Sequence, residues 1–234
     1  MTDIVKMGFG PNDRTPEQVD DLYNAGRLSI RPLDHRLDLL AGTAGGHYIL
    51  TAIYSNTAAK PAAGSDVLSL RWSDTKLLFV LNKLTLSLTV TTAYTASLAQ
   101  DATLYKASCF SVAASAGTNI SAVIGQRLRN NNMNPTSLIA GGNGQLWVSS
   151  GDALTVGTRT LDTYPMGYIS WINAITTPTI VGPLVLFDAT VPGKHPIILG
   201  PSEGIVVQTP IGNAQVAGVS KWAFTLEYSE LAQY

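Results

Sequence analysis

The three histidines are the side chains that could bind a metal ion or transfer a proton near neutral pH. They are His35, His47 and His195. Metal ligands must converge on one ion, and motifs such as HxH or HExxH place two of them on one strand or helix. No histidine here has such a neighbour, and the spacing of His35 and Asp38 recurs by chance. We therefore predict no metal site and interpret the histidines as structural.

A single cysteine, Cys109, is the candidate thiol nucleophile. Such a thiol needs a histidine partner and a local cause for a lowered pKa. Cys109 lies instead in an apolar run between Ser108 and Phe110, which favours a thiol buried in the core. One cysteine also excludes an internal disulfide framework, so we expect a chain made in a reducing cytosol and stabilised by packing.

Carboxylates and serines offer no clearer catalytic pattern. A glycosidase places two carboxylates on facing walls of a cleft, but most of the 16 acidic residues precede turns or lie near the N-terminus. Glu203 occupies an expected tight turn, and Glu227 and Glu230 lie on the last expected strand. Residues 200–204, Gly-Pro-Ser-Glu-Gly, match the Gly-x-Ser-x-Gly spacing, but they lie in an expected turn between two apolar runs and not between a strand and a helix. The glycines at 45–46 and 141–144 lack the context of a phosphate loop. We predict no catalytic residue, no cofactor and no enzymatic activity.

Four tryptophans could stack on sugars, or they could anchor a core or an interface. They are Trp72, Trp147, Trp171 and Trp222. In a β domain the core or interface role is the more common one, and the glycan-binding role stays open as the alternative.

A short polar and basic patch comprises Arg127, Arg129 and residues 130–132, which are all asparagine. It could contact an acidic partner, or it could be a solvated loop. The segment 119–121, Asn-Ile-Ser, matches a glycosylation sequon. We interpret this match as chance, because residues 1–30 lack the pattern of a secretory signal.

The composition narrows the functional class. The chain has 234 residues, of which 45% are hydrophobic and only 13% are charged, about half the usual charged share of ~25%. Such surfaces are common in secreted β domains and in proteins buried within large assemblies. The net charge of −1 provides no field for nucleic acid, and no apolar run reaches the roughly 18–20 residues of a membrane span. We predict neither a nucleic-acid nor a membrane partner.

The residues from His195 to Leu231 contain the clearest structural pattern. Two apolar runs flank a Pro-Ser-Glu-Gly turn, and a long alternating segment follows a Gly-Asn loop. In that segment one face has the residues Trp222, Phe224, Leu226 and Tyr228. The other face has Lys221, Ala223, Thr225 and Glu227. This period of two predicts a strand with one buried face and one wetter face.

Similar alternation recurs upstream, and turn signals follow about every 8–12 residues, as in antiparallel sandwiches and barrels. The expected strands cover residues 47–55, 66–73, 77–92, 103–113, 146–149, 166–174 and 184–189, and residues 120–129 fit either a helix or a strand. We therefore predict an all-β fold, an antiparallel β-sandwich or barrel of jelly-roll-like type.

The N-terminal residues have a different pattern. Residues 1–14 are irregular, and a short helix is expected from Thr15, where Gln18 completes a capping box, to Gly26. The glycine-rich joint at 41–46 precedes the first strand. We predict an extended arm with a short helix over residues 1–46 and one β-sandwich domain over 47–234. A loop and helix packed on the same domain remain the alternative.

Three segments together resemble a family of virion structural proteins of tailed bacteriophages. They are DVLSLRWSDTKLLFVLNKLTLSL (66–88), VGTRTLDTYPMG (156–167) and HPIILGPSEGIVVQTPIGNAQVAGVSKWAFTLEYSE (195–230). The resemblance runs from about His47 to Glu230 and leaves out the N-terminal 45 residues.

The resemblance implies a non-enzymatic capsid decoration, or cement, protein. Such proteins are small, β-rich and commonly homotrimeric, and they bind the major capsid protein on the outer surface of the virion. The chain would then be made in the cytoplasm of the host bacterium. The alternative within the same setting is a tail, neck or fibre module, with glycan binding for host attachment. The resemblance assigns no individual binding residue.

Overall fold

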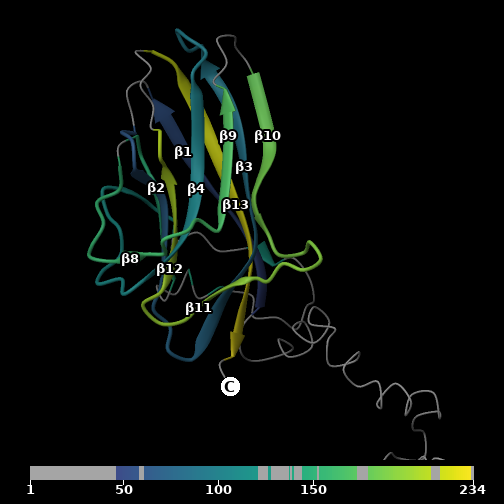
Figure 1. Cartoon of the computed structure of the whole chain (residues 1–234). Coiled ribbons are helices and arrows are strands. Elements are labelled where there is room, and N and C mark those ends of the chain that lie inside the picture. Colours follow the sequence, from purple (N-terminus) through teal and green to yellow (C-terminus); the bar gives the residue numbers. More distant parts are fainter. Residues whose placement is uncertain are drawn as a thin grey trace, which may run out of the picture.

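A computed structural model describes residues 46–57, 61–120, 126–127, 137, 139, 144–151, 153–172, 179–211 and 217–232. Within these ranges every regular element is a β-strand, and the strands form two antiparallel sheets packed face to face (Figure 1). The predicted β-sandwich is thereby confirmed. The arm and helix expected in residues 1–45 lie outside the described residues. The described part also contains no helix with the length and apolar character that a membrane crossing requires.

The strands follow the chain in a simple order. They are β1 (Gly46–Thr57), β2 (Ser65–Trp72), β3 (Leu77–Thr92), β4 (Ala99–Ser108), β5 (Gly117–Asn119), β6 (Gln126–Arg127), β7 (Gly144–Ser149), β8 (Thr160–Leu161), β9 (Gly167–Ile172), β10 (Thr179–Asp188), β11 (Ile197–Leu199), β12 (Gly204–Thr209) and β13 (Val219–Ala232).

Eight of these strands wrap as a jelly roll. Sheet A has the order β10-β3-β13-β1, and sheet B has the order β9-β4-β12-β2. The first four strands of the chain pair with four later strands in reverse order. The pairs are β4 with β9, β3 with β10, β2 with β12, and β1 with β13. This nested pairing of two Greek keys is the jelly-roll arrangement, so the jelly-roll-like expectation is also confirmed.

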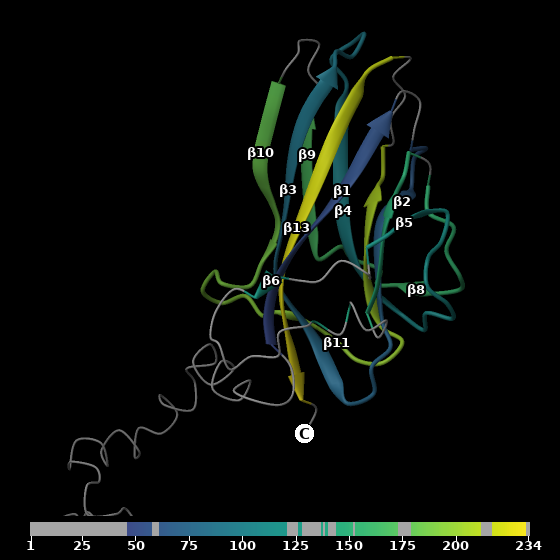
Figure 2. The ribbon, with the colours of Figure 1, turned by 180° about the vertical axis from the view of Figure 1, so that it is seen from behind.

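The long C-terminal strand β13 lies at the centre of sheet A, between β1 and β3 (Figure 2). Its alternating pattern is confirmed, because Trp222, Phe224 and Leu226 are fully buried while Lys221 on the other face is exposed. Full burial of one large apolar side chain contributes roughly 1.5–3 kcal/mol. The strand with the clearest sequence pattern therefore contributes one whole face to the core.

Aromatic side chains form much of the core between the sheets. The ring of Trp222 meets those of Tyr54 and Trp171 edge to face, with centroids 5.3 and 4.9 Å apart. Phe79 stacks on Tyr228 at 4.9 Å. The indole N–H of Trp72 donates to a backbone carbonyl 2.7 Å away, so its one polar group is satisfied. The core interpretation is confirmed for Trp72, Trp171 and Trp222, which are all buried.

A long insertion, residues 109–166, separates the paired strands β4 and β9. Its strand β7 extends sheet B beside β2, and its strand β8 pairs with β4. Residues of the insertion cover part of the outer face of sheet B, where Phe110 is buried with Ala107 and Val206 in a second, smaller cluster. The outer face of sheet A differs, because side chains such as Thr51, Ile53 and Lys221 remain exposed there.

Several strand boundaries differ from expectation. The strand expected over 184–189 is β10, which begins at Thr179 and ends at Asp188. The strand expected over 103–113 is β4, which begins at Ala99 and ends at Ser108. It ends there because Cys109 adopts a φ of 57°, which a strand cannot continue through. In the ambiguous segment 120–129, residues 126–127 form the short strand β6 beside β1, and most of the remainder lies outside the described residues.

Candidate functional site

A buried ion pair lies on the outer face of sheet B. Arg159, from the insertion, places Nη2 2.6 Å from Oδ2 of Asp66 on β2, and both side chains are almost fully covered. Gln208 on β12 donates to the other oxygen of Asp66 at 2.8 Å. The guanidinium also lies over the ring of Phe110, 5.9 Å from its centroid. This pair fastens the insertion to the sheet.

Burial dominates the electrostatics of Asp66. Desolvation raises the pKa of its carboxyl group, while the Gln208 hydrogen bond and the Arg159 charge act in the opposite direction. Within the described chain, Nε and Nη1 of Arg159 and the hydroxyl of Ser69 are buried without a hydrogen-bond partner. The arrangement is closed to solvent and places no group where a large substrate could reach it.

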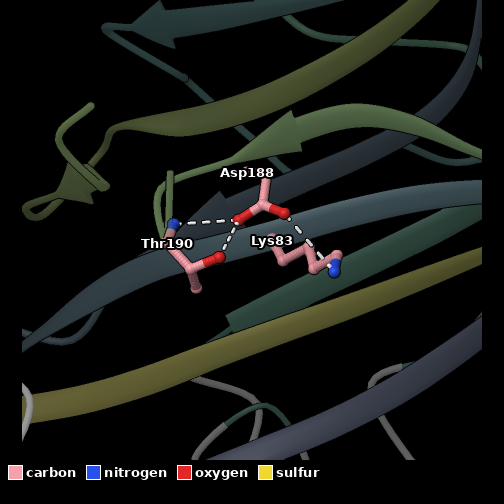
Figure 3. Close-up of polar contacts among 3 residues, drawn as sticks. All are labelled: Lys83, Asp188 and Thr190. Carbon is pink, nitrogen blue, oxygen red and sulfur yellow. Dashed lines mark hydrogen bonds and ion pairs between the residues drawn. The ribbon is translucent and has the colours of Figure 1, made fainter. Parts of the chain in front are cut away.

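A second polar arrangement lies on the outer side of sheet A (Figure 3). Asp188, at the end of β10, accepts hydrogen bonds from the hydroxyl of Thr190 at 2.6 Å and from its backbone N–H at 2.8 Å. The ammonium group of Lys83 on β3 lies 3.4 Å from the other oxygen. These contacts, led by the Thr190 hydroxyl, hold the pKa of Asp188 below its usual value. They close the turn after β10 and join it to β3.

A third cluster is buried at the end of the core where β13 finishes. The hydroxyl of Ser137 donates to Glu230 at 2.6 Å and accepts from the hydroxyl of Tyr228 at 2.9 Å. Burial raises the pKa of Tyr228. Glu230 has no exposed surface, so this serine and carboxylate are in contact but inaccessible to a substrate. The sequence contained a signal for this burial, since Glu230 continues the inward face of Trp222 and Tyr228.

The histidines do not meet at a common site. His47 on β1 is half-buried and its Nδ1 lies 2.8 Å from the hydroxyl of Ser229. His195 is exposed in the segment before β11, and His35 lies outside the described residues. No group of three or more His, Cys, Asp or Glu side chains is arranged to hold a metal within the described ranges.

The expectation that Cys109 is a buried core thiol is wrong. The side chain is exposed, because the chain leaves the sheet at this residue with a positive φ of 57°. Within the apolar run that suggested burial, the next residue, Phe110, is buried and Cys109 is not.

The remaining candidates are dispersed. Glu203 lies in the expected tight turn, where it accepts the backbone N–H of Gly200 at 2.7 Å and pairs with Lys106 at 3.0 Å. Glu227 faces outward on β13, opposite Lys83 of β3. Trp147 on β7 is half-buried, and the exposed Asn119 of β5 is its cross-strand neighbour. Arg127 belongs to β6, while Arg129 and residues 130–132 lie outside the described part.

One side of the sandwich combines two edge strands with apolar, accessible side chains. There β9 ends sheet B and β10 lies at the edge of sheet A, and the two run side by side in both views (Figures 1 and 2). We call residues 164–172 and 179–187 the uncharged rim. Its exposed large side chains are Tyr164, Met166, Tyr168, Ile172, Ile180 and Val185.

The rim has a signal in the sequence that motif searching missed. Residues 163–187 form a run of 25 positions without a charged residue, the longest such run in the chain. An edge strand normally bears charges, proline or a bulge that discourage association. In β10, Pro183 and two register shifts provide this protection, whereas β9 has a regular register and neither proline nor charge.

No protein-family model matches this chain. A search of curated proteins likewise finds no matching sequence.

Proposed function

We propose that the protein is a non-enzymatic structural component of a tailed-bacteriophage virion. In this proposal it decorates the outer capsid surface, binds the major capsid protein, self-associates as a homotrimer, and stabilises contacts between capsid subunits. The proposal combines the resemblance of residues 47–230 to phage virion proteins with the surface properties of the sandwich.

The uncharged rim is the observation that carries the assembly role. Ile180 and Ile172 expose 75% and 67% of their surface, and Tyr164 exposes 80%. Exposed apolar side chains on neighbouring edge strands are unfavourable for a free monomer and usual where another protein covers them. A protein that functions within an assembly satisfies this requirement.

The fold and the polar clusters are consistent with the same role. Jelly rolls occur in viral capsid domains and in lectins, although a fold alone does not determine function. The buried groups Asp66, Arg159 and Glu230 contact partners within the chain, which suits fastening of the sandwich better than turnover of a substrate.

Localisation on purified particles tests the proposal. An antibody against this chain, detected with gold by electron microscopy, should label the whole shell in clusters around threefold positions. Label confined to the neck or the tail tip would replace decoration with a connector or attachment role. Particles without label, from a lysate that contains the protein, would refute the virion assignment.

Glycan binding is the second candidate, and Trp147 favours it as the tryptophan that is not buried in the described core. Quenching of intrinsic fluorescence by added host glycans would support an attachment module. Because Trp72, Trp171 and Trp222 are buried, such quenching should disappear in Trp147→Phe. Unchanged fluorescence across a panel of host glycans would argue for the structural role.

A further inference from the structure

We propose that the uncharged rim is the surface through which one copy of this chain contacts a second copy. The inference rests on the assembly part of the proposed function but requires neither a capsid nor a phage. It assigns a particular surface and a particular occupant, and each step follows from the described residues of β9 and β10.

The first step concerns what the rim presents. On β9, Tyr168 and Ile172 point outward while Trp171 between them is buried. On β10, Ile180 and Val185 point outward, and Leu186 packs into the core. Exposed apolar side chains therefore project from both edge strands on this side of the sandwich. The residues that alternate with them on each strand pack against the core.

The second step concerns area. The six large side chains of the rim are 44–80% exposed, and aromatic side chains such as Tyr164 and Tyr168 bury roughly 150–250 Å² each when fully covered. A standard protein–protein interface buries about 800 Å² on each partner. The exposed side chains of the rim can therefore contribute a substantial part of an interface of that size.

The third step concerns charge. A partner that covers the rim loses hydration, and any charged group placed opposite it would be buried without a counter-charge. A second copy meets this requirement with its own rim, which is uncharged over residues 163–187, and with much of its other surface, because only 13% of the chain is charged. The net charge of −1 also leaves little long-range repulsion between copies. A second copy is therefore the occupant that fits best.

The fourth step concerns the backbone. Among the described strands β9 is hydrogen-bonded only to β4, so alternate residues direct their N–H and C=O groups away from the sheet. Strand addition at β10 is opposed by Pro183 and by the register shifts on either side of Val185. The contact is therefore centred on β9, with the side chains of β10 at its border.

The test is the oligomeric state of the full-length purified protein, measured by light scattering coupled to size-exclusion chromatography over a range of concentrations. The wild-type chain should have a mass that is a small multiple of 24.8 kDa. Tyr168→Lys on β9 and Ile180→Lys on β10 should each raise the dissociation constant at least about tenfold, since a buried lysine lacks a partner there.

The matched control is Ile53→Lys. Ile53 exposes 59% of its surface on β1, at the opposite side of sheet A from β10. This variant should retain the wild-type mass, and circular dichroism should show that all three variants are folded. A dimer would indicate rim against rim, and a trimer would indicate rim against another surface of the next copy. The proposal is supported if the dimer or trimer dissociates in the rim variants and persists in the control.

Three results would overturn it. They are a wild-type chain that stays monomeric at tens of micromolar, rim variants with the wild-type mass, or a control that dissociates as readily as the rim variants. A monomer that still labels the capsid shell would refute the rim contact and leave the virion role standing. A stable oligomer that labels no particle would refute the virion role and leave the rim contact standing.

Discussion

At the scale of single residues, the charges of this protein divide into buried and exposed pairs. Asp66 and Arg159 lie within 2.6 Å of each other in a covered site, whereas Lys106 and Glu203 form a half-exposed pair at 3.0 Å. Exposed pairs contribute little because water and salt screen them. A buried pair that loses one member leaves an uncompensated charge, so the two pairs should respond differently to mutation.

We therefore expect Arg159→Met to lower the free energy of unfolding by about 3–5 kcal/mol. Asp66→Asn should have a similar effect, and the double variant should cost less than the sum because the two residues are coupled. Urea titration measures these values. The control Lys106→Met should change stability by about 0–1 kcal/mol. Equal effects of Arg159→Met and Lys106→Met would contradict the structural importance assigned to the buried pair.

Asp188 leads to a prediction about pH. Its contacts with Thr190 and Lys83 lower its pKa from the ordinary value of 3.8, so the folded state binds its proton less readily than the unfolded state. The stabilisation is therefore complete above the ordinary value and is lost as the pH falls through the lower native value.

Wild type and Asp188→Asn should consequently differ in unfolding free energy at neutral pH, and the difference should shrink as the pH falls below 3.8. Denaturant titrations at several pH values provide the measurement. The exposed residue Asp162, changed to Asn, controls for the charge alone. A difference that grows on acidification would mean that the sign of the linkage is wrong.

At the scale of elements, the two sheets approach each other closely at the start of β9. A Cβ added at Gly167 of β9 would meet the carbonyl oxygen of Leu186 on β10. This backbone contact joins the two edge strands, and glycine is needed there for space rather than for an unusual φ. The regular ladder between β9 and β4 continues from this residue.

Gly167→Ala should therefore destabilise the fold by roughly 1–3 kcal/mol, the usual cost of overpacking. Thermal unfolding followed by circular dichroism is sufficient to detect it. Gly200→Ala is the matched control, because its Cβ would meet only Glu203, at 3.6 Å. If Gly167→Ala unfolds at the wild-type temperature, the two edge strands are not held together in this way.

At the scale of the whole molecule, the asymmetry of the sandwich is its main feature. The insertion covers part of the outer face of sheet B, the uncharged rim forms one side, and the outer face of sheet A stays accessible in the described chain. The charged residues are also uneven, since 12 of the 31 Asp, Glu, Lys and Arg residues lie in the first 45 positions. The predicted arm is therefore the most highly charged part of the protein.

Deletion of residues 1–45 should leave a folded β domain that binds the particle poorly. The described sandwich begins at Gly46, where β1 pairs with Glu230 of β13, so the truncated chain retains every described strand. Co-sedimentation with particles that lack the protein compares the two chains. If the truncated chain sediments as well as the full-length chain, the arm has no part in particle binding.

The sequence by itself determined the strands and their buried faces. In β3 and β13 the period of two predicts which side chains point inward, because alternation is a local property of an extended backbone. The core or interface interpretation of the four tryptophans rests instead on their usual role in β domains, and it holds for Trp72, Trp171 and Trp222, which are buried in the core. The lack of HxH or HExxH spacing was also visible in the sequence, although it does not test what the protein does.

Only the tertiary structure decided which strands pair and which polar residues are buried. The nested pairing of β1 with β13 and of β4 with β9 joins residues far apart in sequence, and contacts at such separations leave no local pattern. The burial of Asp66 depends on Arg159, which lies in an insertion 93 residues later. Cys109 shows the converse, since one positive φ carries an apparently apolar position to the surface. The uncharged rim likewise needs the fold, because a charge-free run becomes an exposed surface only when its two strands both lie at sheet edges.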